Sequence, residues 1–269
     1  MKNKVEDIVE ECLRNIKDNP KNINAYNTLG VAYGLMNNRD GAHQQFDRAI
    51  ELKPDFADPY NNRGYIHLLA KHYQKAISDF CKAIELDPKF AEAHFNFGIA
   101  SFLQNKFKQS IECFSRAIRL KNSDSYYYYS RGMAYHKNRQ FKEAIDDYEQ
   151  SEKMNPSDPN TQSKCLIPAS LGDFQIVELK PDYAKSRYNK GLANFKLGRY
   201  KESAYCFSDA INSRPDYIKA YFERGSAYRK LGDNKLAYRD YVQYLNRLPA
   251  ENWKERRGVK WLIDNLLSD

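Results

Sequence analysis

Residues 23–56 read INAYNTLGVAYGLMNNRDGAHQQFDRAIELKPDF, and the pattern of this stretch returns along the chain every 34 residues. Its glycine, Gly30, recurs as Gly64, Gly98 and Gly132, and Gly191 and Gly225 are again 34 residues apart. A period of about 20–50 residues indicates an array of similar small units rather than one compact core.

Other residues of the stretch keep the same period. Its markers are Tyr26, Leu29, Gly30, Tyr33, Ala42, Phe46, Ala49 and Pro54. The aromatic marker recurs as Phe46, Phe80, Phe114, Tyr148, Phe207 and Tyr241. We expect the small residues where two helices of a unit cross, the aromatic ring beside that crossing, and the proline at the end of the second helix. Each unit then leaves an apolar face that only its neighbour can cover.

This pattern resembles the tetratricopeptide repeat, and the resemblance covers about residues 20–250 in six full repeats and one damaged repeat. It implies an all-α fold: a right-handed superhelical solenoid of antiparallel helix pairs with N- and C-terminal capping helices. We expect residues 1–269 to form one array, which divides into an N-terminal half-repeat (1–20), four regular repeats (21–156), a truncated repeat (157–181), two regular repeats (182–250) and a C-terminal capping helix (251–269).

The truncated repeat is the one irregularity in the lattice. Pro156 and Pro181 are separated by 25 residues, nine fewer than the period, and most of a second helix is absent. We interpret residues 157–181 as a hinge between two blocks of repeats. An accidental deletion or a splice variant is the alternative.

Composition limits the classes of protein that the chain can belong to. The net charge is +8, with 13 basic and 14 acidic residues in 1–100 and 30 and 21 in 101–269. No apolar run is long enough to span a membrane, and the charged N-terminus does not resemble a signal peptide, which predicts a cytosolic protein without a membrane partner. Five cysteines without a C-x-x-C pair argue against disulfides and zinc.

The sequence gives no support for catalysis. The histidines have no metal-ligand spacing, and no nucleotide-binding loop, nucleophile elbow or kinase signature occurs; the histidines are His43, His67, His72, His94 and His136. We therefore expect no catalytic residue, no metal site and no cofactor.

The resemblance implies a concave groove lined by the first helix of each unit. One groove position holds Asn62, Asn96 and Asn189. Because an amide offers both a donor and an acceptor, such a ladder can bind the backbone of an extended peptide. It resembles part of the ladder in the repeats of O-linked N-acetylglucosamine transferases.

Two further sets of residues are expected in the groove. The later units place basic side chains there: Lys137, Lys185, Lys196, Lys219, Arg229 and Lys230. Solvation of a helix face is the alternative explanation for these residues. Tyr65, Tyr126 and Tyr129 are candidate stacking or hydrogen-bonding contacts, with Tyr128 expected in the core.

These features predict a non-catalytic scaffold that binds a peptide or an extended protein segment, with the acidic end of the ligand towards the later repeats. The alternatives are a nucleic-acid-binding repeat protein and a regulatory module of a larger enzyme assembly. The sequence pI of about 9.0 favours the nucleic-acid-binding alternative. Basic residues that alternate with acids argue against nucleic acid. The sequence leaves the oligomeric state open.

Overall fold

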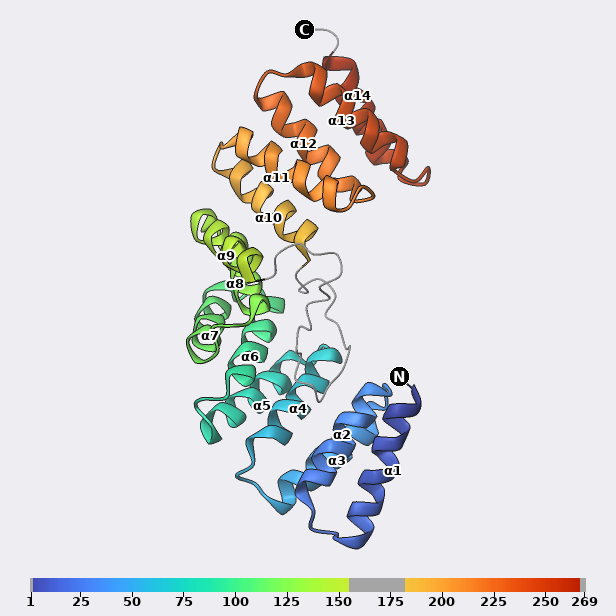
Figure 1. The fold of residues 1–269 in the computed structure, drawn as a ribbon, viewed down its shortest axis with the longest axis vertical. Helices are drawn as coiled ribbons and strands as arrows, with labels where there is room; N and C mark the ends of the chain where they lie inside the picture. Colours follow the sequence, from blue (N-terminus) through green and yellow to red (C-terminus); the bar gives the residue numbers. More distant parts are fainter. Residues whose placement is uncertain (1, 155–181, 267–269) are drawn as a thin grey trace. The chain divides into compact units, whose positions relative to one another are not determined.

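The computed structural model describes residues 2–154 and 182–266, and every regular element in these ranges is an α-helix (Figure 1). The helices are α1 (Lys2–Asp18), α2 (Ile23–Leu35), α3 (Arg39–Leu52), α4 (Ala57–Leu69), α5 (Tyr73–Leu86), α6 (Ala91–Leu103), α7 (Phe107–Leu120), α8 (Ser125–Lys137), α9 (Phe141–Met154), α10 (Tyr183–Lys196), α11 (Tyr200–Ser213), α12 (Ile218–Lys230), α13 (Asn234–Arg247) and α14 (Trp253–Leu266). The expectation of an all-α solenoid is confirmed. The proposed hinge at 157–181 lies outside the described residues and stays a prediction.

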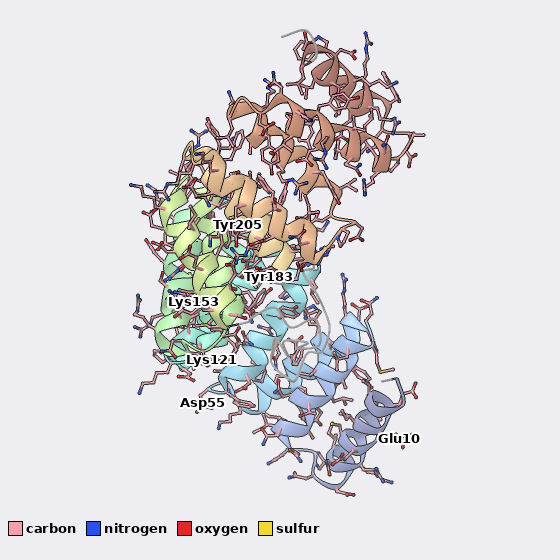
Figure 2. The ribbon with its side chains drawn as sticks, turned by 45° about the horizontal axis from the view of Figure 1, so that its top comes forward. Glu10, Asp55, Lys121, Lys153, Tyr183 and Tyr205 are labelled. Carbon is pink, nitrogen blue, oxygen red and sulfur yellow. The ribbon has the colours of Figure 1, made fainter. Side chains whose placement is uncertain are left out.

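The described residues belong to two compact units. Unit 1 contains residues 2–134, and unit 2 contains residues 135–154 and 182–266. In each unit, helices that follow one another along the chain pack together, as α4 does with α5 and α10 with α11. Charged side chains cover the outer surfaces of the helices, and Asp55 and Lys121 lie in two of the turns that join successive pairs (Figure 2).

The crossing of the two helices in a pair explains the glycine and the aromatic residue of the repeat. A Cβ atom built on Gly98 would lie 2.6 Å from Cδ1 of Phe114, and one built on Gly64 would lie 2.8 Å from Cε1 of Phe80. Both phenylalanine side chains are fully buried. Burying a phenylalanine stabilises a fold by about 1.5–3 kcal/mol, so each pair forms its core around this contact.

The turn inside each pair also follows the repeat. One residue per turn has a positive φ: Asn37, Lys71, Asn105 and Arg139, and then Gly198 and Gly232, with φ between 58° and 79°. In the turn at Lys71, the backbone N–H of His72 donates to the carbonyl oxygen of His67 at 2.9 Å. The left-handed residue reverses the chain after the first helix and satisfies carbonyl groups at its end.

In two of the helix pairs, a buried ion pair joins the first helix to the second. Arg63 of α4 donates from Nε and Nη2 to the two carboxylate oxygens of Asp79 at 3.0 and 2.6 Å. Arg224 of α12 does the same with Asp240 at 2.7 and 2.7 Å. Because both aspartates are nearly inaccessible to solvent, the guanidinium supplies the charge and the hydrogen bonds that they would otherwise lack.

The terminal helices cover the ends of the described array. In α14, Val259 and Leu266 are buried in the core of unit 2, whereas Trp253 and Trp261 are 61% and 64% exposed. At the other end, α1 packs on α2, and the thiol of Cys12 is buried. Each of these two helices thus covers the outer side of a helix pair with its apolar side chains.

Candidate binding surface of the first helices

The first helices of successive pairs contact one another. In unit 1, α4 contacts both α2 and α6, and in unit 2, α10 contacts α12. We call the surface that these helices form in each unit the first-helix face. It carries most of the residues that the sequence predicts as ligand contacts.

An amide chain connects the first helices of unit 1. Asn62 donates from Nδ2 to Oδ1 of Asn27 at 3.0 Å, and Asn96 donates from Nδ2 to Oδ1 of Asn61 at 2.9 Å. Asn61 in turn donates to Oδ1 of Asn62 at 3.5 Å. Asn62 and Asn96 are only 4% and 5% exposed, so their amides join successive repeats instead of forming an open ladder.

The corresponding position of unit 2 is different. Asn189 of α10 is half-buried, and the next repeat places Glu223 there. Burial raises the pKa of the Glu223 carboxyl, while the charge of Lys196 lowers it. The predicted series of asparagines therefore changes from an amide to a carboxyl group between α10 and α12.

Most of the predicted basic residues are on the surface. Lys137, Lys196, Lys219, Arg229 and Lys230 are exposed, and Lys185 is half-buried, with its Nζ 3.8 Å from Oδ2 of Asp182.

Two of these lysines, Lys137 and Lys196, affect the pKa of one side chain, His136. Burial and, to a smaller extent, the positive charges of Lys137 and Lys196 together lower the pKa of His136 to about 4. These lysines come from α8 and α10, so the fold brings together two charges that are distant in the sequence.

The predicted tyrosines are interior residues. Tyr129 is 1% exposed, Tyr65 is 5% exposed, and Tyr126 packs against Phe95 with ring centroids 4.8 Å apart. Their burial corrects the expectation that they contact a ligand. Tyr128, which we expected in the core, is half-buried and lies under the guanidinium of Arg131, 5.7 Å from its ring centroid.

Sequence reasoning missed Asn61 and His136. Asn61 accepts the hydrogen bond of Asn96, and a signal for it exists, because Asn27 and Asn61 are 34 residues apart. Nδ1 of His136 is buried without a hydrogen-bond partner, and nothing in the local sequence indicates this.

The described residues hold no group of three or more His, Cys, Asp or Glu side chains that could bind a metal ion. The four cysteines in this part of the chain, Cys12, Cys81, Cys113 and Cys206, are free thiols. Burial raises the pKa of each thiol, to about 12 for Cys113, which keeps the thiols protonated and unreactive. No described helix has the length and apolar character needed to cross a bilayer.

Helix pairs with this crossing define a class of α-helical repeat proteins. Sequence models of the tetratricopeptide repeat match residues 23–53, 57–90, 125–158 and 218–247, and a model described as TPR repeat matches residues 98–138 and 191–232. The chain belongs to the tetratricopeptide repeat family. This fold is typical of scaffolds for protein–protein interaction.

Solved structures of this family share the fold. The TPR protein YrrB, whose structure is described as having an unusual peptide-binding site, is 20% identical, with a TM-score of 0.62 over 76% of this chain and 93% of YrrB. PilF of Pseudomonas aeruginosa is 15% identical, with a TM-score of 0.65 over 88% of this chain and 96% of PilF.

A further similar structure belongs to a larger protein. A chain of the APC/C hetero-tetramer Cut9–Hcn1 is 15% identical, with a TM-score of 0.65 over 99% of this chain and 46% of that chain. No curated protein matches the sequence. At these identities the similarity concerns the fold alone.

Proposed function

We propose that the protein is a non-catalytic scaffold that binds an extended protein segment on the first-helix face of unit 2, with acidic side chains of the ligand beside Lys137 and Lys196. The observation that carries the proposal is the joint effect of these two lysines on His136. Both are exposed, and neither forms an ion pair within the described residues. Two positive charges near one another attract a carboxylate more strongly than separate charges do, and Lys196 also lies within electrostatic reach of Glu223.

Other groups support an oriented ligand. Lys219, Arg229 and Lys230 of α12 extend the positive charge along the same unit. Asn62 and Asn96 enter the proposal as links between repeats of unit 1, because their amides bond to neighbouring asparagines. The peptide-binding site described for YrrB is consistent with a ligand of this class.

Fluorescence anisotropy of a labelled peptide with alternating serine and glutamate tests the proposal. Each exposed charge pair contributes up to about 1 kcal/mol, so Lys137→Ala with Lys196→Ala should weaken binding by up to about 30-fold. The loss should shrink as salt is added, because screening weakens exposed charges.

A matched variant removes the same charge elsewhere in unit 2. Lys142→Ala with Lys153→Ala changes two exposed lysines of α9 and should leave the affinity within about twofold of the wild type. Equal losses in the two variants would show that only net charge matters, which contradicts the proposal. Tighter binding of a single-stranded oligonucleotide than of the peptide would favour the nucleic-acid alternative.

A further inference from the structure

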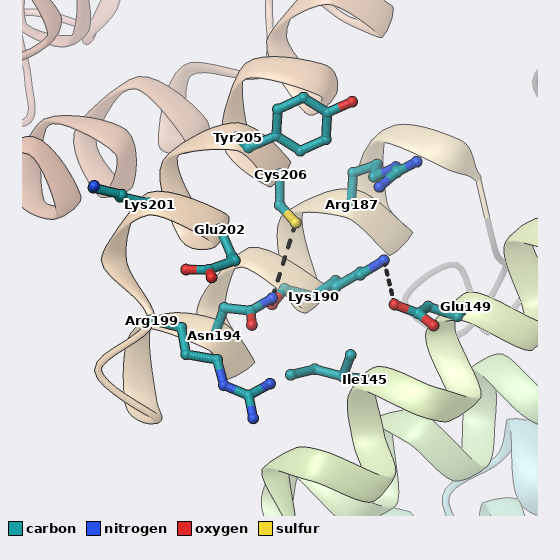
Figure 3. Close-up of a pocket in the computed structure, with 10 residues that line it drawn as sticks. All are labelled: Ile145, Glu149, Arg187, Lys190, Asn194, Arg199, Lys201, Glu202, Tyr205 and Cys206. Carbon is teal, nitrogen blue, oxygen red and sulfur yellow. Dashed lines mark hydrogen bonds and ion pairs between the residues drawn. The ribbon is translucent and has the colours of Figure 1, made fainter.

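A cavity of about 480 Å³ lies within unit 2, between α9, α10 and α11 (Figure 3). Residues of all three helices and of the turn before α11 line it, and the residues on which the argument depends are Glu149, Lys190, Asn194, Arg199, Glu202 and Tyr205. None of the residues proposed above as ligand contacts lines the cavity, so the two candidate sites use different side chains. Its volume suits a small ligand or a few side chains of a partner.

The cavity lies where the buried ion pair of other repeats is missing. In α12, Arg224 occupies this position and donates hydrogen bonds to Asp240 of α13. Its Nη1 also donates to Oγ of Ser208 of α11 at 3.0 Å. One repeat earlier, 34 positions back, Lys190 stands in place of Arg224 and Cys206 stands in place of Asp240.

This exchange leaves space on one side of Lys190. An ammonium group is a compact point charge, whereas a guanidinium is a planar fork with several donors. Nζ of Lys190 lies 2.9 Å from Oε1 of Glu149 and 3.7 Å from Oε2 of Glu152, both on α9. Cys206 has only a long contact, 4.0 Å from its Sγ to Nδ2 of Asn194. Within the described residues, Lys190 therefore forms its ion pairs with α9 and none with α11.

The wall and rim of the cavity carry charges without partners. Arg199 and Lys201 form no ion pair or hydrogen bond through their side chains within the described residues, and Glu202 next to them forms none either. Figure 3 shows the guanidinium of Arg199 beside Asn194 and Ile145, across the cavity from the paired Lys190 and Glu149. Glu149 pairs with Lys190, and Glu152 and Asp209 lie 3.7 and 3.6 Å from Nε of Arg187, so among the arginines of the lining Arg199 is the one without an ion pair within the described residues.

Tyr205 adds an aromatic surface at the rim. Its side chain is 64% exposed, although a tyrosine usually buries most of its ring. Tyrosine and arginine side chains are both enriched at the centres of protein interfaces.

From this arrangement we propose that the cavity binds an anionic side chain, a carboxylate or a phosphoryl group, of a partner protein, with Arg199 as its main contact and Tyr205 packing against the adjoining residue of the partner. Asn194 and Ile145 form the wall beside the anion. This site is independent of the first-helix face, and either proposal can fail without the other.

A tryptophan reporter in the cavity tests the proposal. Tyr205→Trp in a background of Trp253→Phe and Trp261→Phe places the single indole at the rim. Its emission is followed during titration with three peptides that carry a central glutamate, phosphoserine or lysine. We expect a saturable change with the first two peptides and none with the lysine peptide, and the tighter of the two identifies the anion. No change with either anionic peptide would overturn the proposal.

Two variants of the reporter assign the contact. Arg199→Ala with Lys201→Ala should weaken binding about 10-fold or more, the loss expected for a charge-assisted hydrogen bond. Glu202→Gln should tighten it by about threefold, because it removes a repelling carboxylate, and a merely misfolded variant cannot produce this gain.

The matched control is Arg239→Ala with Lys235→Ala, which removes one exposed arginine and one exposed lysine from α13. This control should bind within about twofold of the reporter. If it loses as much affinity as the Arg199 variant, or if Glu202→Gln weakens binding, the cavity is not the anion site.

Discussion

Replacing Gly191 by alanine tests the helix crossing on which each repeat is built. A Cβ atom there would lie 2.7 Å from Cε1 of Phe207, whereas ordinary contacts are 3.4–4 Å, so the fully buried ring must move by at least about 0.7 Å. Overpacking of this kind costs about 1–3 kcal/mol, and the better helix propensity of alanine returns about 1 kcal/mol. We therefore expect the free energy of unfolding to fall by up to about 2 kcal/mol.

Gly258 of α14 provides the control in the same unit, because a Cβ atom there meets nothing within 4 Å. Gly258→Ala should raise the free energy of unfolding by up to about 1 kcal/mol. Urea denaturation followed by far-ultraviolet circular dichroism measures both variants, and Phe207→Leu in the Gly191→Ala background should recover part of the loss. Equal stabilisation by both alanines would refute the close-approach argument.

Two further predictions concern a turn and a buried histidine. Lys71→Gly should raise the free energy of unfolding by about 0.5–1 kcal/mol, because Lys71 has φ of 61°. Gly198→Ala should lower the free energy of unfolding by a similar amount. An unchanged melting temperature in both variants would contradict this prediction. The pKa of His136 is about 4 in the fold against 6.5 ordinarily, so the unfolded chain binds an extra proton between these values. Stability should fall as pH drops from 6.5 to 4, and His136→Phe should flatten this slope in urea titrations; parallel slopes would exclude the assignment.

The sequence predicts the fold more fully than the binding surface. Gly98 and Phe114 could be matched from the sequence because their spacing repeats in every unit. The run from Tyr126 to Tyr129 could not be oriented in this way, because four identical residues give no apolar periodicity. A helix turns by about 100° per residue, so a shift of one position exchanges a core side chain for a surface one. The structure places Tyr129 in the interior and leaves Tyr128 half-buried.

The contacts of the asparagines were hidden for a different reason. The expected ladder compares residues that are 34 apart, whereas the bond between Asn27 and Asn62 joins residues 35 apart. Repeat periodicity identifies equivalent positions, but a bond between repeats joins two different positions. The electrostatic effect of Lys196 on His136 likewise joins residues 60 positions apart, which local sequence does not reveal.

The amide chain of unit 1 has a consequence for how such an array can grow. Each link needs an acceptor such as Asn61 in one repeat and a donor such as Asn96 in the following repeat. Residues 57–90 carry both kinds of asparagine side by side, so a tandem duplication of this segment would add one link. Duplication of residues 91–124 would add none, since Phe95 stands where the acceptor is required. Arg63 and Asp79, by contrast, lie within one repeat and would be duplicated together as a complete ion pair.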